Sequence, residues 1–115
     1  MKIGLIGLGN MGRNHLRVCR KLEDEYSDFC VSAIYDPAHE GMNDLSAFMK
    51  KVADLDGAII CAPSHKHADI AHDLFRENPN IKLLIEKPID DDLEKAKTLM
   101  FYSDKIFVGH IERFN

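Results

Sequence analysis

The sequence lacks several features that mark specialised classes of protein. It has no tryptophan and only three cysteines, Cys19, Cys30 and Cys61, which show no CxxC spacing and lie within apolar segments. An odd number of cysteines placed in this way is typical of reduced, packed thiols rather than of disulfides or metal ligands. His65, His67 and His72 could suggest a metal site, but no carboxylate or cysteine pattern joins them. We therefore expect no metal.

Long apolar runs and an excess of basic residues are also missing. No apolar run approaches the roughly 20 residues of a membrane-spanning helix. The first seven residues are too few, and too soon interrupted by glycine, for a signal peptide. With 19 acidic and 15 basic residues the net charge is −4, which does not favour binding to a phosphate backbone. We expect a cytoplasmic protein that binds neither nucleic acid nor membranes.

What the sequence does contain predicts one α/β domain spanning residues 1–115. Of the residues, 45% are hydrophobic, which is enough for one core. Short β-branched runs alternate with helical periods, a pattern that predicts a parallel sheet with crossover helices. Strands are expected at 2–6, 29–35, 57–62, 81–85 and 106–109. The expected inward-facing residues are Met11, His15, Cys19, Leu22 and Tyr26 in the first helix, and Leu93, Ala96 and Met100 in the last.

A glycine-rich segment lies between the first strand and the first helix. Gly7-Leu8-Gly9-Asn10-Met11-Gly12 matches the pattern GxGxxG. Gly7 allows a tight turn, Gly9 allows a pyrophosphate to approach the backbone, and Gly12 allows the helix to pack closely on the strand. The free amides at the start of the helix favour an anion. Because glycine-rich turns can also serve packing alone, this match needs a second feature to support it.

Asp36 is that second feature. It ends the second strand, where a carboxylate can accept hydrogen bonds from the two hydroxyls of a ribose and repel a 2′-phosphate. No arginine or lysine occurs among the next ten residues, so NAD is favoured over NADP. Asp36 could instead only begin an Asp-Pro turn. Together with the glycine segment it predicts a three-layer, doubly wound parallel sheet of the Rossmann type that binds a dinucleotide.

Two further motifs follow later strands. They are Ala62-Pro63-Ser64-His65-Lys66-His67-Ala68 and Glu86-Lys87-Pro88, and the chain ends in Val-Gly-His-Ile-Glu-Arg-Phe-Asn. With the glycine segment, these motifs resemble the N-terminal domain of the glucose–fructose oxidoreductase, inositol dehydrogenase and MocA (Gfo/Idh/MocA) family over nearly the whole chain.

This resemblance implies a role for each motif. Glu86 would contact the cofactor side, while Lys87, the expected catalytic residue, would reach the nicotinamide and the substrate hydroxyl. The Lys87-Pro88 bond is often cis in this family. The other implied cofactor-binding residues are Gly7, Gly9, Asn10, Met11 and Gly12 around the pyrophosphate, Asp36 at the adenosine ribose, and Ala62, Pro63, Ser64 and His67 toward the nicotinamide ribose.

The sequence departs from the family pattern in two ways. Only 20 residues separate Asp36 from Gly57, whereas a helix, a third strand and another helix would need more than about 30. The third strand is therefore expected to be shortened or missing. The family's second domain, which would follow residue 115 and complete the substrate site, is expected to be absent.

The leading hypothesis is the NAD-binding domain of an oxidoreductase that transfers hydride between a hydroxyl-bearing carbon and nicotinamide. The substrate would be a sugar, a nucleotide-linked sugar or a polyol, bound only with a second domain, and a homo-oligomer stays open. By itself the chain would bind cofactor only. The alternative is a non-catalytic nucleotide-binding or sensor module, or a remnant of such an enzyme. The retained Glu86-Lys87-Pro88 favours the enzyme, because a sensor needs no lysine at the nicotinamide.

Overall fold

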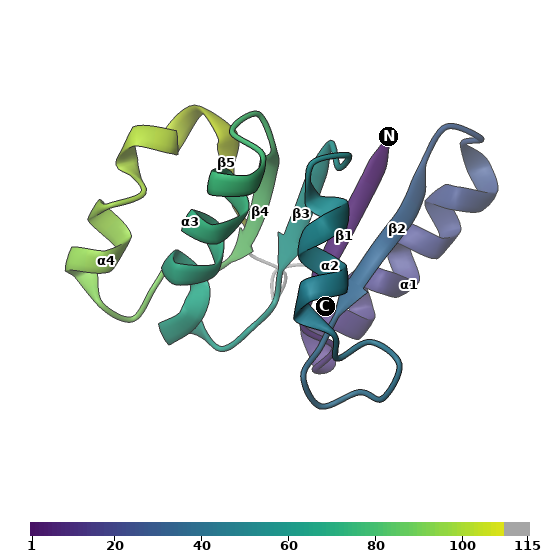
Figure 1. The fold of residues 1–115 in the computed structure, drawn as a ribbon, viewed down its shortest axis with the longest axis horizontal. Helices are drawn as coiled ribbons and strands as arrows, with labels where there is room; N and C mark the ends of the chain where they lie inside the picture. The colour runs from purple at the N-terminus through teal and green to yellow at the C-terminus, as the bar shows by residue number, and fades with distance from the viewer. Residues whose placement is uncertain (110–115) are drawn as a thin grey trace.

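A computed structural model describes residues 1–109 as a five-stranded parallel sheet with helices on both faces (Figure 1). The strand order is β2-β1-β3-β4-β5. Residues 110–115, which contain most of the terminal motif, lie outside the described part of the chain. The elements are β1 (Lys2–Ile6), α1 (Asn10–Glu25), β2 (Cys30–Tyr35), α2 (Leu45–Val52), β3 (Gly57–Ile60), η1 (Ser64–Lys66), α3 (His67–Glu77), β4 (Lys82–Glu86), α4 (Leu93–Lys97), η2 (Met100–Lys105) and β5 (Ile106–Gly109).

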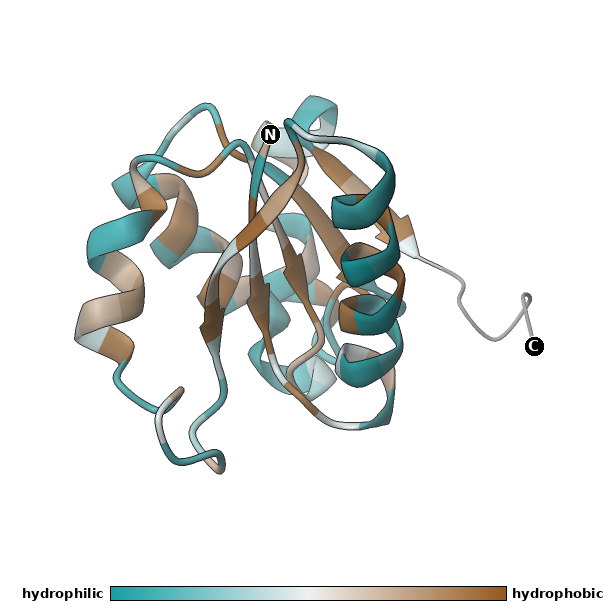
Figure 2. Cartoon of the chain, turned by 90° about the vertical axis from the view of Figure 1, so that its right-hand side faces the viewer, coloured by the Kyte–Doolittle hydropathy of each residue, from teal (hydrophilic) through white to brown (hydrophobic). Residues whose placement is uncertain are grey.

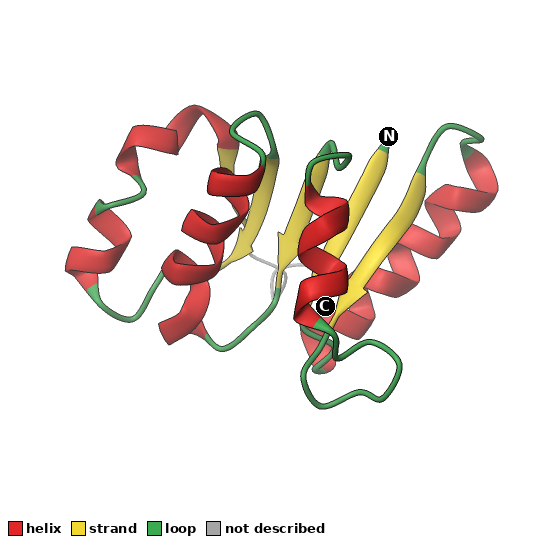
Figure 3. Cartoon of the chain, viewed as in Figure 1, coloured by secondary structure: helices red, strands yellow, loops and turns green. Residues whose placement is uncertain are grey.

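The helices lie on opposite faces of the sheet because the chain changes direction after β2. It moves from β1 outward to β2, then crosses back past β1 to β3 and continues to β5. Since crossovers between parallel strands are right-handed, this reversal places α1 on one face and α2 and α3 on the other (Figure 3). The predicted doubly wound α/β fold of the Rossmann type is confirmed, and all five predicted strands are present.

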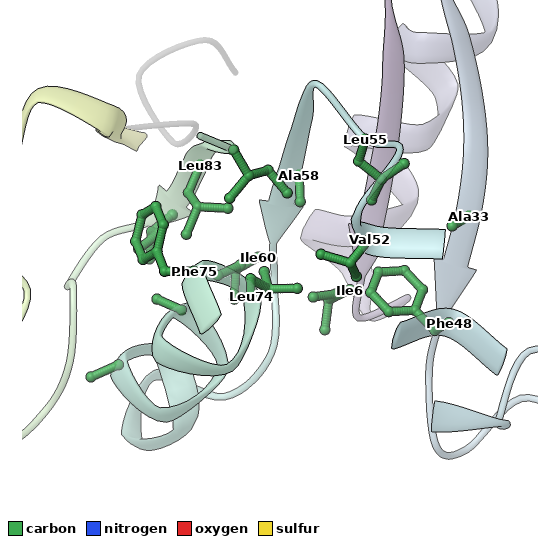
Figure 4. Close-up of a cluster of buried hydrophobic side chains, with 14 of the residues drawn as sticks. Ile6, Ala33, Phe48, Val52, Leu55, Ala58, Ile60, Leu74, Phe75 and Leu83 are labelled. Carbon is green, nitrogen blue, oxygen red and sulfur yellow. The ribbon is translucent and has the colours of Figure 1, made fainter. Parts of the chain in front are cut away.

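The main core lies between the sheet and the α2–α3 layer (Figure 4). Val52, Ile60 and Leu74 are each 0% exposed. Hydropathy follows the same layering, with apolar strands enclosed by helices whose outer surfaces are polar (Figure 2). Burying each such side chain contributes roughly 1.5–3 kcal/mol. The core therefore fixes the positions at which the strands end, and so the positions from which the following loops begin. Within residues 1–109, no helix is both long and apolar enough to cross a membrane.

The segment between β2 and β3 contains α2 but, as far as the structure describes it, no strand. The predicted absence of a third strand is therefore confirmed. Asp44 caps α2, its carboxylate accepting the Ala47 N–H at 3.0 Å. β2 consequently lies at the edge of the sheet. The Glu23 carboxylate accepts the Val31 N–H of this strand at 2.9 Å, a side-chain contact to the backbone that helps to blunt the exposed edge.

The predicted inward-facing residues of the last helix were partly wrong. Leu93 is 67% and Met100 71% exposed, whereas Leu99 is 2% exposed and joins the core. For Leu99 and Met100 the physical reason is that α4 ends at Lys97 and the chain continues into a 3₁₀ helix, whose tighter winding shifts the angular positions of later side chains. Leu93 is the first residue of α4, a helix of only 5 residues, and is exposed there. Tyr26 is also not part of the buried stripe of α1, because the helix ends at Glu25 and the chain there becomes extended.

Candidate functional site

The carboxyl ends of β1 and β3 form the point at which the strand order reverses, where open α/β sheets bind their ligands. The glycine loop after β1 meets the segment after β3 here. Gly7 has a positive φ of 98°, and a Cβ on it would lie 2.8 Å from both the carbonyl carbon and the oxygen of Cys61. Only glycine therefore fits between these two loops.

Gly9 and Gly12 have very different surroundings. A Cβ on Gly12 would lie 1.8 Å from the Gly7 carbonyl oxygen, so the first turn of α1 packs directly on the loop. A Cβ on Gly9 would meet no atom within 4 Å. The space in front of Gly9 is therefore open to an incoming group, while Gly12 serves the contact between helix and loop.

The N-terminus of α1 is electrostatically suited to an anion. No side chain caps it, and its first turn, which contains Asn10 and Met11, has no acidic residue. The free amide groups and the helix dipole therefore have no negative partner within the first turn of α1 itself. Arg13, which the motif analysis did not include, donates from Nε to the Leu8 carbonyl oxygen at 3.0 Å and adds a cation beside the loop.

Asp36 is tied to the same loop. It is 8% exposed, and its carboxylate accepts the Leu8 N–H at 2.5 Å and the Ala38 N–H at 2.7 Å, with His39 Nδ1 at 3.3 Å. Burial alone would raise the pKa of Asp36, but these hydrogen bonds and His39 outweigh it and lower the pKa below its ordinary value. The Ala38 bond forms an Asp-Pro turn, so the turn and the contact to the glycine loop coexist.

One cavity of about 630 Å³ connects these features. It is within the usual size range of small-molecule sites. Of the residues predicted for the cofactor, it is lined by Gly7, Gly9, Asp36, Ala62 and Pro63. Lys66 also lines it, although no motif singled out this lysine. The inner wall is apolar and comes from α2 and α3, including Leu45, Phe48, Met49, Ile70 and Leu74.

Ser64 and His67 lie outside the lining of this cavity. The Ser64 hydroxyl donates to Asp91 at 2.5 Å. His67 is 2% exposed, with Nε2 2.6 Å from the Ala62 carbonyl oxygen and Nδ1 2.9 Å from that of Pro88. Both side chains therefore connect the loop after β3 to the loop after β4, from behind the cavity wall.

Glu86 forms a second cluster beneath the glycine loop. It is 8% exposed and pairs with Nε2 of His15 on α1. Cys61 completes the group, whose ligand atoms all lie within 4.8 Å of one another, a spacing that could hold a metal ion. Glu86 and His15 already pair with each other. Burial, followed by the charge of Glu86, raises the pKa of the Cys61 thiol to about 12, which opposes its use as a thiolate ligand.

Lys87 follows Glu86 at the end of β4 and is exposed. Its backbone N–H donates to the Gly109 carbonyl oxygen of β5 at 3.2 Å, and the Lys87-Pro88 peptide bond is cis. The backbone of this lysine is therefore held between two strands while its side chain is free to reach outward. The described structure thus places the glycine loop, Asp36 and the Ala62-Pro63 loop around one cavity, with Glu86 and Lys87 ending the neighbouring strand.

Comparison with known proteins agrees with this arrangement. Residues 1–105 match the family model described as an oxidoreductase family with an NAD-binding Rossmann fold. The chain is 30% identical over 132 residues to 4-carboxy-2-hydroxymuconate-6-semialdehyde dehydrogenase of a Sphingobium species, covering 100% of this chain and 40% of that protein. It is 29% identical over 127 residues to inositol 2-dehydrogenase of Rhizobium meliloti, covering 100% of this chain and 37% of that protein.

A solved structure shows the same fold. UDP-N-acetylglucosamine 3-dehydrogenase of Acidithiobacillus ferrooxidans superposes with a TM-score of 0.74 at 24% identity, over 98% of this chain and 39% of that one. The chain thus spans 37 to 40% of the length of the two curated relatives. On its motifs, its fold and the match of residues 1–105, the chain belongs to the Gfo/Idh/MocA oxidoreductase family, as a dinucleotide-binding Rossmann domain.

Proposed function

We propose that this chain binds NAD(H) as the cofactor domain of a dehydrogenase that acts on a hydroxyl group of a sugar or polyol. The observation that carries the proposal is the joint placement of Gly9 and Asp36 on one cavity. Gly9 leaves open space before the uncapped N-terminus of α1, which suits a pyrophosphate. Asp36 supplies an anionic acceptor suited to a ribose diol.

In this proposal the pyrophosphate lies along Gly7 to Gly12, including Asn10 and Met11, and the adenosine ribose lies at Asp36. Ionised Asp36 can only accept hydrogen bonds, so it favours free hydroxyls and repels a 2′-phosphate. One cation opposes this preference, since Lys66 lines the same cavity. NAD is still favoured, because the buried Asp36 carboxylate is held in place by two backbone N–H groups, whereas Lys66 is exposed.

Lys87 is proposed as the catalytic residue. Bound nicotinamide would accept the hydride from the substrate carbon. Exposed at the end of β4, the lysine would assist removal of the proton from the substrate hydroxyl. Glu86 would support the cofactor side through its pair with His15. Ala62 and Pro63 would line the cofactor toward the nicotinamide ribose, while Ser64 and His67 would support that loop.

The substrate class follows the polyol named for one relative and the family motifs. Because the relatives are longer, we propose that substrate binding needs a second domain and that this chain alone binds cofactor without turnover. The three free cysteines are consistent with the cytoplasm as the proposed compartment. Exposed Lys87 beside the site favours the enzyme over a sensor module.

Isothermal calorimetry with NAD⁺, NADH, NADP⁺ and NADPH tests the cofactor proposal. We expect micromolar to millimolar binding of NAD(H) and at least about tenfold weaker binding of NADP(H), a difference of about 1.4 kcal/mol. A chain that binds none of the four, or that prefers NADP(H), would overturn the proposal. ADP-ribose serves as the control ligand because it keeps the pyrophosphate and both riboses but lacks nicotinamide.

A further inference from the structure

His67 is buried at the start of α3 with a carbonyl oxygen at each ring nitrogen. Its Nε2 lies 2.6 Å from the Ala62 oxygen and its Nδ1 lies 2.9 Å from the Pro88 oxygen. A carbonyl oxygen can only accept a hydrogen bond, and a neutral imidazole has only one N–H to donate. Both contacts are hydrogen bonds only when the ring carries two protons and is an imidazolium. In the neutral ring, one nitrogen lone pair would face a carbonyl lone pair.

A negatively charged group lies near the ring. Asp90 is 7% exposed, and its carboxylate accepts the N–H groups of Ala68, next to His67, and of Asp92. Burial would raise the pKa of Asp90, but these two hydrogen bonds and the charges of Lys95 and His67 lower it, so a carboxylate is present. The other charged and titratable residues of segments 62–69 and 86–95 are His65, Lys66, Asp69, Glu86, Lys87, Asp90, Asp91, Asp92, Glu94 and Lys95.

Two effects oppose a cation here. The ring is 2% exposed, and burial disfavours its charged form. His67 is the first residue of α3, and the N-terminal end of a helix dipole disfavours positive charge. Asp90, bound to the amide of the second residue of the same helix, offsets this dipole. The two carbonyl oxygens add partial negative charge directly at the ring, at hydrogen-bond distance. The local acceptors therefore outweigh the helix end.

The two carbonyl groups belong to the two loops that the proposed function uses. Ala62 lines the cofactor cavity, and Pro88 directly follows Lys87. The Lys87 N–H donates to the Gly109 carbonyl oxygen, and the carbonyl oxygen of the next residue, Pro88, contacts the His67 ring. The backbone on both sides of the lysine is therefore held. A ring that donates to both carbonyls fixes the distance between the cavity wall and the lysine.

We propose that His67 is a positioning residue that acts as a buried imidazolium, donating to Ala62 and Pro88 and thereby holding Lys87 in place relative to the bound cofactor. This role rests on the proposed NAD site. The protonation state does not, because it is inferred from the two contacts of the ring itself. The two parts can therefore be tested separately.

The protonation state is tested by nitrogen-15 NMR of the imidazole rings at about pH 7.5, where an ordinary exposed histidine is mostly neutral. We expect both ring nitrogens of His67 to show the chemical shifts of protonated nitrogen. Exposed His65, two residues before His67, is the internal control. The nitrogen-15 chemical shifts of the two rings should differ. A single unprotonated nitrogen in the His67 ring would overturn the proposal.

The positioning role is tested with H67Q, whose amide has only one donor nitrogen to reach a carbonyl. H72Q is the matched control, because His72 lies on the same helix and bonds Thr98 instead of a cofactor loop. In H67Q, we expect NAD⁺ affinity to fall about tenfold, the equivalent of about one strong hydrogen bond, and by less than about twofold in H72Q.

Acetylation of Lys87, followed by mass spectrometry, gives a readout that a purely structural role would not move. Bound NAD⁺ should protect Lys87 in the wild type and in H72Q but not in H67Q, compared at equal cofactor occupancy. Equal protection in folded H67Q would overturn the positioning role. If H67Q does not fold, the nitrogen-15 spectrum of the wild type decides whether the His67 ring donates to both carbonyl groups. A wild type that binds no NAD⁺ refutes the proposed function and leaves the spectrum to be judged separately.

Discussion

The Asp36 carboxylate accepts the backbone N–H of Leu8 at 2.5 Å, which joins the end of β2 to the glycine loop after β1. The same carboxylate accepts the Ala38 N–H within its own turn. A carboxylate has about four acceptor positions, so these bonds leave room for a ribose diol. Asp36 therefore shapes the loop that faces the pyrophosphate and also presents a negative charge to the ribose.

The first prediction separates the charge of Asp36 from its shape. In D36N the side chain keeps its size but loses the charge that repels a 2′-phosphate. It also loses one of the two bonds to backbone N–H groups, because only one acceptor oxygen remains. We expect the preference for NAD⁺ over NADP⁺ to narrow about tenfold, close to 1.4 kcal/mol, in calorimetric titrations with both cofactors. D73N is the control, since Asp73 lines the same cavity from α3. An unchanged preference in D36N would refute the assignment of the ribose to Asp36.

A second prediction uses the contrast between two glycines of one loop. In G12A the added methyl group would meet the Gly7 carbonyl oxygen at 1.8 Å, so we expect a loss of stability of more than about 3 kcal/mol, measured by urea unfolding. In G9A the methyl group meets nothing, so stability should change by less than about 1 kcal/mol.

Cofactor binding should be lost in G9A nonetheless, because the methyl group occupies the space proposed for the pyrophosphate. Calorimetry on the folded variant checks this. A G9A protein that is stable and binds NAD⁺ like the wild type would place the pyrophosphate elsewhere.

The glycine loop, Asp36, Ala62 and Pro63 could be placed from the sequence because backbone geometry fixes them. Each follows a strand, and parallel strands bring their carboxyl ends to one edge. Lys66, Met49 and His39 could not, because the direction of a side chain depends on how its own segment packs, and these three lie in η1, in α2 and in the turn after β2. Sequence patterns place residues on a helix face only while the helix continues, which is why Met100 was wrong and Leu99 was missed. Leu93 was wrong because the helix that it begins is short and leaves its first residue exposed.

The third prediction concerns acid stability. The folded pKa values of Asp36 and Asp90 are lowered, so each carboxylate stabilises the fold fully above the ordinary aspartate pKa of about 3.9. That stabilisation is lost as the pH falls below about 4 toward the folded pKa values. We expect the melting temperature to fall steeply there, and less steeply in D90N than in the exposed control D104N. If the melting temperatures of D90N and the wild type fell equally steeply below pH 4, this account would be contradicted.

The fourth prediction concerns thiol reactivity. Burial and the charge of Glu86 raise the pKa of Cys61 to about 12, so only about one in 10⁴ molecules carries the thiolate at pH 8. Iodoacetamide should therefore modify Cys61 in the folded chain at least about a hundredfold more slowly than in the chain unfolded by urea. Peptide mass spectrometry at several times gives both rates. Equal rates in the two states would show that the thiol is not buried beside Glu86.

The last prediction concerns the adenine end of the site, where the short segment between Asp36 and Gly57 has no strand. A sheet without that strand would by itself leave adenine without one wall and weaken cofactor binding. In the structure, α2 approaches the same cavity, and Met49 belongs to its apolar lining. We therefore expect α2 to supply the adenine contact that the missing strand does not.

Removing the Met49 side chain beyond Cβ should expose roughly 60 Å² of apolar surface at about 25 cal/mol per Å², or about 1.5 kcal/mol. M49A should thus weaken binding of NAD⁺ and of AMP about equally, near tenfold, because both contain adenine. K50A is the matched control, since Lys50 is exposed on the same helix. Unchanged affinity for both ligands in folded M49A would mean that adenine does not reach α2 and that this side of the site is open.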